Sequence, residues 1–363
     1  MEEISPKKSE LKKSCVNCGA ELTYAPGTTE LKCDYCGHTE TIAPSENGFE
    51  ELELKPYLEK MGSQKHSEEI TMLHCKNCGA NQHIEENYKS LSCIYCGSPL
   101  IIEDAYKEEW ILPGAVLPFQ IDQKKAFQIF KKWVDGLWFA PNNLKKAAID
   151  PEKTRGLYAP YWTFDAQLYA DYTGQRGEYY YVTKTVGSGK NRRTVQERRT
   201  RWYPASGSVS GFVDDNLVKA SNQKTGVIPQ KIARWNLKML KPFDSSYLAG
   251  FVTEKYTIPL LEGHLESNKI AESIADSWIR RDIGGDTQQV TSTDMTLSEE
   301  TFKHVLLPVY ISTYRFKGKR YNFFVNGQSG VISGERPYSF WKIFFLVLTI
   351  ILAIVIIYIF SSK

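Results

Sequence analysis

The chain has 363 residues, 42% of them hydrophobic and 24% charged, and its formal net charge is +3. This length allows two or three domains, and this composition favours a packed core over disorder. The near-balanced charge argues against a protein that binds nucleic acid over its whole surface. The segment from Met1 to Ser14 is charged and contains no apolar run, so we expect no secretory signal there.

All eight cysteines lie in the first hundred residues. They form four Cys-x-x-Cys pairs, which are Cys15 and Cys18, Cys33 and Cys36, Cys75 and Cys78, and Cys93 and Cys96. Fourteen residues separate the first pair from the second, and the third from the fourth. A glycine follows every pair and permits the positive φ with which backbone amides turn toward sulfur.

Four thiolates at this spacing are typical of tetrahedral zinc, and four sulfur ligands leave no open position for catalysis. The segments between the pairs are too short for a hydrophobic core, so the metal must supply folding free energy. We therefore predict two structural Zn2+ ions in two zinc ribbons with four cysteine ligands each, residues 1–42 and residues 72–103. The second ribbon repeats the first at an offset of 60 residues. Disulfides, redox-active cysteine pairs and iron in place of zinc are the alternatives.

The segment between the ribbons, residues 43–71, is acidic and polar. Its apolar residues are spaced to fit one short amphipathic helix, and they are Phe49, Leu52, Leu54, Tyr57, Leu58 and Met61. We interpret this segment as a linker with a short helix, and a partner-binding helix is the alternative.

The region after the ribbons begins with an α+β pattern over residues 104–240. Residues 115–121 predict a strand, Asp122 is a helix N-cap, and a helix follows through Leu137. Residues 156–172 then predict a strand that ends at a glycine turn.

Residues 241–338 show a similar order of patterns. A strand is predicted over residues 255–261, followed by a helix through Ile279. Residues 305–311 lead into a hairpin that turns at Lys317 and Gly318. The shared order predicts a duplicated strand–helix–hairpin body with an α+β fold.

The most basic stretch, residues 184–201, lies inside the first half and is flanked by aromatic residues. We predict a long β-hairpin that turns near Gly187 and Gly189. Its cationic side chains are candidates for binding anions or lipid headgroups, and they are Lys190, Arg192, Arg193, Arg198, Arg199 and Arg201. A merely solvated hairpin end is the alternative. The stretch fails as a phosphate loop, because Asn191 stands where Ser or Thr is required.

A run of apolar residues closes the chain and predicts a transmembrane helix over residues 341–360. It is uncharged from Ile343 to Phe360, about the length that crosses a bilayer core of roughly 30 Å. Arg336 and Lys342 lie on its entry side, and only Lys363 lies beyond it. The positive-inside bias then predicts a single-pass protein of the cell membrane whose body lies in the cytoplasm. A buried core helix is the alternative.

The sequence shows none of the residue patterns that usually carry catalysis, such as a nucleophile elbow or a zinc-protease motif. Asp165, Asp214 and Asp215 lie among aromatic residues, where we interpret them as turn or cap residues. We expect no enzyme, no catalytic residues and no small-molecule substrate.

Two further motifs accompany the ribbons and the terminal helix. They are Pro160-Tyr-Trp-Thr-Phe-Asp-Ala166 and Val325-Asn-Gly-Gln-Ser-Gly330. In this combination the chain resembles a bacterial family of TFIIB-type zinc-ribbon membrane proteins, which are often labelled primosomal helicase-like. The helicase label reflects the ribbons alone. The resemblance implies members encoded beside phage-shock and flotillin-like (SPFH) proteins, and hence a role in membrane stress or membrane organisation.

These observations favour a non-catalytic adaptor that holds protein partners at the cytoplasmic face of a membrane. The resemblance suggests flotillin-like or phage-shock proteins as those partners. The alternative is a membrane-tethered zinc-ribbon protein that binds nucleic acid. It is less favoured because the segments between the cysteine pairs, residues 20–32 and 80–92, carry as many acidic residues as basic ones or more.

Overall fold

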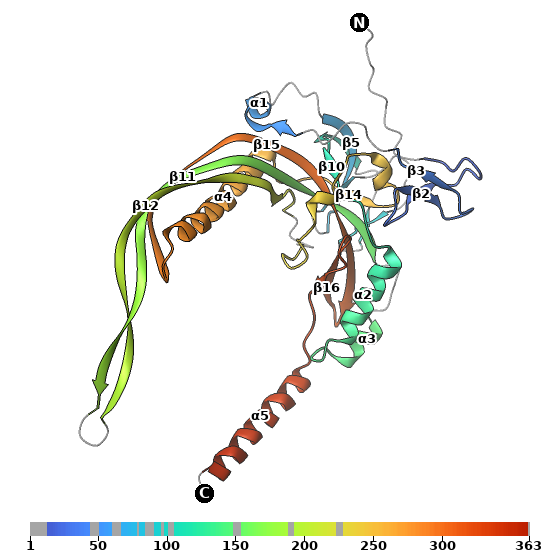
Figure 1. Cartoon of the computed structure of the whole chain (residues 1–363). Coiled ribbons are helices and arrows are strands. Elements are labelled where there is room, and N and C mark those ends of the chain that lie inside the picture. The colour runs from blue at the N-terminus through green and yellow to red at the C-terminus, as the bar shows by residue number, and fades with distance from the viewer. Residues whose placement is uncertain are drawn as a thin grey trace.

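The computed structural model describes residues 13–43, 51–59, 67–77, 80–83, 91–95, 98–100, 105–147, 154–187, 192–222 and 228–361. This part of the chain mixes strands with helices, and one apolar helix stands apart at the C-terminus (Figure 1). The α+β class predicted from the sequence agrees with this composition of elements.

One large sheet dominates the described part of the molecule. Its twelve strands are β4 (Leu52–Glu53), β5 (Ser67–His74), β6 (Asn81–His83), β9 (Ala105–Ile111), β10 (Ala115–Val116), β11 (Arg155–Val186), β12 (Arg193–Lys219), β13 (Lys241–Pro242), β14 (Val252–Glu254), β15 (Thr287–Phe316), β16 (Lys319–Asn326) and β17 (Ile332–Gly334). The main order is β13-β10-β15-β11-β14-β6-β5-β9, while β12 pairs with β11, β4 and β16 with β15, and β17 with β16.

Three very long strands, β11, β12 and β15, form a curved three-stranded sheet that extends away from the body (Figure 1). We call this curved sheet the arch. Irregularities in the pairing near Asp165 and Thr173 interrupt the register, and such bulges bend a strand and increase its twist. The strand predicted over residues 156–172 is therefore right in kind but wrong in its end. Gly174 and Gly177 continue the ladder, and no glycine turn follows Tyr172.

Helix α4 (Leu260–Ile283) lies against the concave side of the arch (Figure 1). Its buried positions recur every three or four residues and are mostly small, so the helix can approach the strands closely. At Gly263 a Cβ atom would lie 2.7 Å from the Trp162 ring, so only glycine fits there. The helix predicted through Ile279 is confirmed. The strand predicted over residues 255–261 is wrong, because α4 begins at Leu260.

The opposite end of the body carries two helices, α2 (Gln123–Asp135) and α3 (Asn142–Ala147). The predicted N-cap is confirmed, since the Asp122 side chain accepts a hydrogen bond from the Lys125 N–H at 2.6 Å. Helix α2 packs through Phe130, whose ring stacks on Phe323 of β16 at 3.5 Å between centroids. Of the strand predicted over residues 115–121, only Ala115 and Val116 pair as β10.

The segment predicted as a linker also joins the body. Helix α1 (Leu54–Glu59) confirms the short helix expected there, and it is preceded by β4, which pairs with β15. Leu54 is buried, and the Tyr57 ring meets Phe302 edge-on at 4.9 Å between centroids. Short 3-10 turns occur at Leu237–Met239 and Ser245–Leu248.

The alternation of side chains along the central strands divides the core into two faces. Tyr158, Leu306 and Tyr310 belong to one buried cluster, whereas their neighbours Leu157 and Val309 belong to another. The first cluster includes side chains of residues 15–42, and the second includes side chains of residues 73–100. The two cysteine-bearing segments therefore cover opposite faces of one sheet.

Candidate metal centre

The first cysteine-bearing segment forms a small three-stranded sheet with two turns at its end. We call these turns, which contain Cys15 and Cys18 and Cys33 and Cys36, the knuckles. Its strands are β1 (Leu22–Tyr24), β2 (Glu30–Cys33) and β3 (Thr39–Thr41), which pair in the order β1-β2-β3. Each knuckle closes in the same way: Gly19 donates to the Cys15 carbonyl at 2.8 Å, and Gly37 donates to the Cys33 carbonyl at 2.9 Å. Both glycines have φ near +75°, the region that L side chains avoid.

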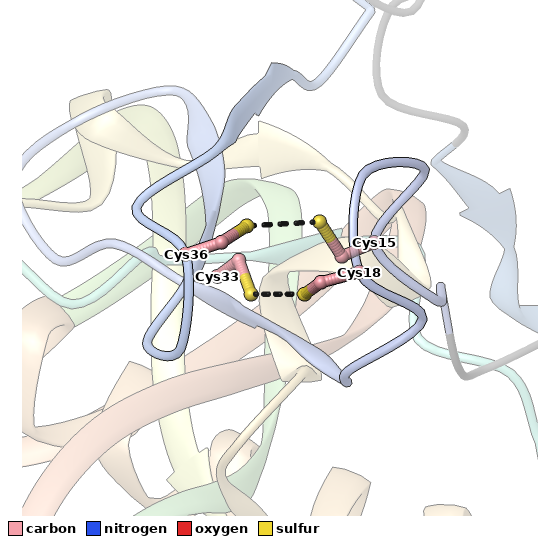
Figure 2. Close-up of side chains that lie close together, drawn as sticks. All are labelled: Cys15, Cys18, Cys33 and Cys36. Atoms are coloured by element: carbon pink, nitrogen blue, oxygen red, sulfur yellow. Dashed lines mark hydrogen bonds between the residues drawn. The ribbon is translucent and has the colours of Figure 1, made fainter.

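These knuckles bring Cys15, Cys18, Cys33 and Cys36 together (Figure 2). All four Sγ atoms lie within 4.8 Å of one another. The contact between Cys15 and Cys36 is 3.4 Å, and that between Cys18 and Cys33 is 3.6 Å. A tetrahedral zinc site with Zn–S bonds of ~2.3 Å has sulfurs ~3.8 Å apart. The spacing therefore fits one tetrahedral metal ion with all four positions filled by the chain.

The electrostatics of the cluster also suit a cation. Backbone N–H groups of Cys36 and Tyr35 lower the pKa of the Cys33 thiol to about 7. The N–H of Ala20 acts in the same direction on Cys18, but burial and the neighbouring thiols raise the pKa of Cys18 to about 12. Four thiolates this close repel one another, and a divalent cation among them removes that repulsion.

The first ribbon, residues 13–43, is fixed to the body by its sheet. Tyr24 donates its backbone N–H to the Ala249 carbonyl at 3.0 Å, and its ring meets Tyr247 edge-on at 5.3 Å between centroids. Gly27 donates to the Phe119 carbonyl at 2.8 Å. Leu22 and Leu31 are each only 1% exposed. The ribbon therefore adds its own apolar side chains to the core of the body.

The second ribbon is described only in part, because Cys78 and Cys96 lie outside the described residues. Cys75 and Cys93 are both 1% exposed. The backbone N–H of Cys75 donates to the Ala80 carbonyl and that of Cys93 to the Ser98 carbonyl, each at 2.8 Å, as Cys15 and Cys33 do to Ala20 and His38. Besides β5 and β6, this region contains the two-stranded sheet of β7 (Leu91–Ser92) and β8 (Pro99–Leu100). The described backbone around Cys75 and Cys93 thus repeats the hydrogen bonds found around Cys15 and Cys33.

The predicted basic hairpin is present, formed by the far ends of β11 and β12. Lys190 lies outside the described residues. The other predicted anion-binding side chains are all exposed, and they are Arg192, Arg193, Arg198, Arg199 and Arg201. The Arg198 guanidinium lies 4.4 Å from the centre of the Tyr179 ring, and that of Arg201 lies 5.1 Å from the Tyr180 ring.

The predicted apolar segment at the C-terminus forms helix α5 (Phe340–Ser361). Its 22 residues span about 33 Å at ~1.5 Å per residue, enough to cross a bilayer core of roughly 30 Å. None of its most apolar stretch is buried. Its first turn is held to the body: the Lys342 ammonium donates to the Trp138 carbonyl at 3.0 Å and to the Ala140 carbonyl at 2.8 Å.

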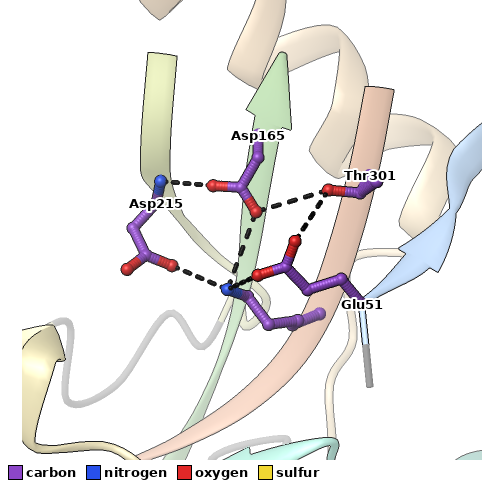
Figure 3. A network of polar contacts seen from close by, with 5 residues as sticks. Glu51, Asp165, Asp215 and Thr301 are labelled. Atoms are coloured by element: carbon purple, nitrogen blue, oxygen red, sulfur yellow. Dashed lines mark hydrogen bonds and ion pairs between the residues drawn. The ribbon is translucent and has the colours of Figure 1, made fainter. Parts of the chain in front are cut away.

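Sequence analysis missed an ionic network in the middle of the arch (Figure 3). The Lys303 ammonium, 6% exposed, lies 2.8 Å from Glu51, 3.1 Å from Asp215 and 3.6 Å from Asp165. Asp165 also accepts a hydrogen bond from the Asp215 N–H, across a bulge between β11 and β12. The prediction that Asp165, Asp214 and Asp215 are turn or cap residues is wrong, because all three lie within these two strands. Burial raises the pKa of Asp165 even though Lys303 opposes that rise. Because Lys303 occupies the position among these carboxylates, the cluster is a structural ion network.

A cavity of about 270 Å³ with several polar side chains in its wall also escaped the sequence analysis. Tyr161 and Lys219 line it, and Glu254 at its wall is 1% exposed and accepts hydrogen bonds from Tyr95 and Ser221. The Tyr161 hydroxyl is buried and has no hydrogen-bond partner among the described residues. The residues that line this cavity come from segments far apart in the chain, so no local sequence pattern could have predicted it.

Comparisons with known proteins add one relative. No protein-family model and no solved structure matches the chain. The chain is 27% identical over 340 residues to the uncharacterized protein YdjG of Bacillus subtilis (strain 168). That alignment covers 91% of each of the two chains, so the likeness extends well beyond the cysteine-bearing segments and includes most of the arch.

Proposed function

We propose that the protein is a non-catalytic adaptor of the cell membrane. Helix α5 holds it in the bilayer in a single pass, its body lies in the cytoplasm, and its zinc ribbons bind protein partners there. The expected setting is envelope stress or membrane organisation, with flotillin-like or phage-shock proteins as candidate partners.

The zinc assignment rests on the donor set. Four thiolates with no oxygen or nitrogen ligand favour zinc over the hard cations, and four protein ligands make the site structural. The backbone bonds shared by Cys15 and Cys75, and by Cys33 and Cys93, support a second ion in the second ribbon. Two structural Zn2+ ions per chain are therefore proposed.

The proposed orientation rests on charge. Lys342 and Arg336 lie at the body side of α5, and Lys363 is the basic residue beyond it. A positive body-side flank keeps that side in the cytoplasm. A reducing compartment also suits cysteines that serve as metal ligands.

The observation that carries the adaptor proposal is the way the first ribbon presents its knuckles. Its strands are buried against the body, but Val16 in one knuckle is 77% exposed and Tyr35 in the other is 85% exposed. Exposed apolar and aromatic side chains on a rigid platform are typical of protein-binding surfaces. Residues held this way have little freedom to lose on binding, which favours recognition of a partner.

The test is a pull-down of the full-length protein from solubilised membranes, with Val16→Ser and Tyr35→Ser combined in one variant. We expect this variant to lose partners that the wild type retains. The matched control combines Thr39→Ala and Thr41→Ala, which are exposed on β3 of the same ribbon but outside the Cys-x-x-Cys sequences. An unchanged partner set in the knuckle variant contradicts binding through the first ribbon.

The anchor has its own test, deletion of residues 343–360. We expect the truncated protein to move to the soluble fraction. Retention of the truncated protein in carbonate-washed membranes contradicts the role of α5.

A further inference from the structure

We propose that the protein contacts its membrane at a second place, through the end of the β11–β12 hairpin. This distal hairpin, residues 178–187 and 192–201, binds the anionic lipid headgroups of the leaflet that α5 enters. The inference rests on the proposed function, because it requires α5 to lie in a bilayer.

The first observation is that the distal hairpin stands free of the sheet. β15 pairs with β11 only as far as Gly177 and Thr287, and beyond that point only β12 continues the ladder. In the described residues from 178 to 201, every side chain is exposed or half-buried. An isolated two-stranded ribbon is marginally stable in water, so a surface that covers it would stabilise it.

The second observation is an unequal distribution of charge. The described residues of the distal hairpin contain six Lys or Arg and two Glu, a net charge of +4. The whole chain carries only +3, so the rest of the molecule is net negative. An anionic leaflet attracts such a basic segment and repels the remainder, which orients the hairpin end toward the lipid.

The acidic residues do not cancel this charge where it is densest. Glu178 is paired with Arg176 at 2.5 Å, and Glu197 is shared between Arg199 at 3.3 Å and Lys184 at 3.5 Å. Within the part of the hairpin that the structure describes, Arg192 and Arg193 make no ion pair with a carboxylate. Both can reach phosphate groups.

The third observation is the mixture of aromatic and cationic side chains. Tyr181 is 62% exposed, and Tyr179 and Tyr180 carry Arg198 and Arg201 on their rings. Tyrosine favours the headgroup level of a bilayer, where its ring is apolar and its hydroxyl is hydrated. Arginine binds phosphate through paired N–H donors, so each stacked Tyr–Arg unit suits this interface.

The fourth observation is the direction of the two projecting elements. The distal hairpin continues from the far end of the arch, whereas α5 leaves the body at the other end. Both project to the same side of the molecule (Figure 1). The root of α5 is held by Lys342 and by the bond from the Ser339 N–H to the Phe139 carbonyl at 2.7 Å. A bilayer that contains α5 therefore lies on the side toward which the hairpin extends.

The experiment uses the full-length protein in nanodiscs of phosphatidylcholine, with or without phosphatidylglycerol, and measures amide hydrogen exchange. We expect exchange in residues 178–201 to slow about tenfold or more in the anionic discs, because each basic residue near such a surface adds to the attraction. Raising the salt from ~0.1 to ~1 M shortens the Debye length from ~10 to ~3 Å and should remove most of the protection. Exchange in α4 serves as the internal reference for an intact fold.

A charge-reversal variant isolates the basic side chains. Arg198→Glu, Arg199→Glu and Arg201→Glu together should abolish the lipid-dependent protection while exchange in α4 stays unchanged. The matched control carries Lys231→Glu, Lys238→Glu and Lys241→Glu, the same change in net charge at exposed positions of the body. The control should keep the protection of the hairpin.

Three results would overturn the inference, and they are distinguishable. If the protein is retained in the discs but hairpin exchange does not respond to phosphatidylglycerol, the second contact is wrong and the anchor stands. If the protein is not retained in the discs at all, both the anchor and the second contact fail. If single-stranded RNA in detergent protects the hairpin and anionic lipid does not, the basic end is a nucleic-acid site.

Discussion

The first ribbon and the distal hairpin are both excursions from the central sheet, but they are built in opposite ways. The ribbon buries Leu22, Leu31 and Tyr24 against the body and ends in a closed cluster of four thiols. The distal hairpin buries almost nothing in its described part and presents arginine and tyrosine to solvent. In the ribbon the residues that define the site also stabilise the fold. In the hairpin, the side chains proposed to bind lipid are not those that stabilise the fold.

The largest expected effect comes from removing the metal of the first ribbon. Cys33→Ser breaks the thiolate set, and because the ribbon shares the core, the body should lose stability with it. We expect the unfolding midpoint to fall by about 10 °C or more, measured calorimetrically together with metal content. Asp34→Ala, an exposed change in the same knuckle, is the control. An unchanged midpoint in a variant that has lost metal would mean that the ribbon is not part of the core.

A pair of truncations sharpens the same contrast. Leu22→Ala removes a side chain that is 1% exposed and should cost about 3 kcal/mol of unfolding free energy. Val195→Ala removes one that is 40% exposed in the hairpin and should cost less than about 0.5 kcal/mol. Denaturant unfolding of both variants provides the measurement. Equal losses would show that Val195 is packed against another part of the molecule.

The pH dependence of stability should come from the body. Burial lowers the pKa of His304 to about 4, although the hydrogen bond from its Nδ1–H to the Ile111 carbonyl at 2.8 Å opposes that fall. The unfolded chain takes up this proton near pH ~6.5, so the contribution is complete above that pH and is lost as pH falls toward 4. The loss should reach about 3 kcal/mol at the low end.

His304→Asn keeps a donor for the Ile111 carbonyl but does not titrate. This variant should therefore show a flatter dependence of unfolding free energy on pH, between about 4 and 6.5, than the wild type. Because neither arginine nor glutamine titrates in this range, Arg198→Gln should leave the slope of the wild type unchanged. A changed pH dependence in the hairpin variant would show that the titrating group lies in the hairpin and not in the body.

Reversal of charge in the hairpin is also expected to have only a small effect on stability. Changing Arg198, Arg199 and Arg201 to Glu should shift the unfolding free energy by less than about 0.5 kcal/mol per site in the absence of lipid. Thermal unfolding in detergent measures this. A large loss without lipid would show that the hairpin's arginines stabilise the fold and do not serve binding alone.

How much the sequence could predict follows from how local each signal is. The four cysteines of the first ribbon, the Asp122 cap and helix α5 are encoded by neighbours within a few residues, and the structure contains each of them. Lys303, Asp165 and Glu51 cluster because segments far apart in the chain meet in the fold. No local sequence pattern predicts this cluster.

The errors have a similar physical origin. Residues 255–261 have the composition of a strand, but Leu260 is needed as the first buried position of α4. Gly174 and Gly177 are normally read as turn residues, yet here they lie in the ladder of a long curved strand. At Gly174 a Cβ atom would approach the Gln289 carbonyl oxygen to 2.4 Å, so glycine permits close contact with β15 and does not reverse the chain. The packing of the ribbons on opposite faces of one sheet is likewise a tertiary property.

The central claim is that closed thiolate sites stabilise a body held in the membrane. Its most direct test is the metal content of the full-length protein purified from the membrane fraction under reducing conditions. We expect two zinc ions per chain in the wild type and one in the Cys33→Ser variant. Protein from that fraction with no bound zinc, or a variant that still binds as much as the wild type, would contradict it.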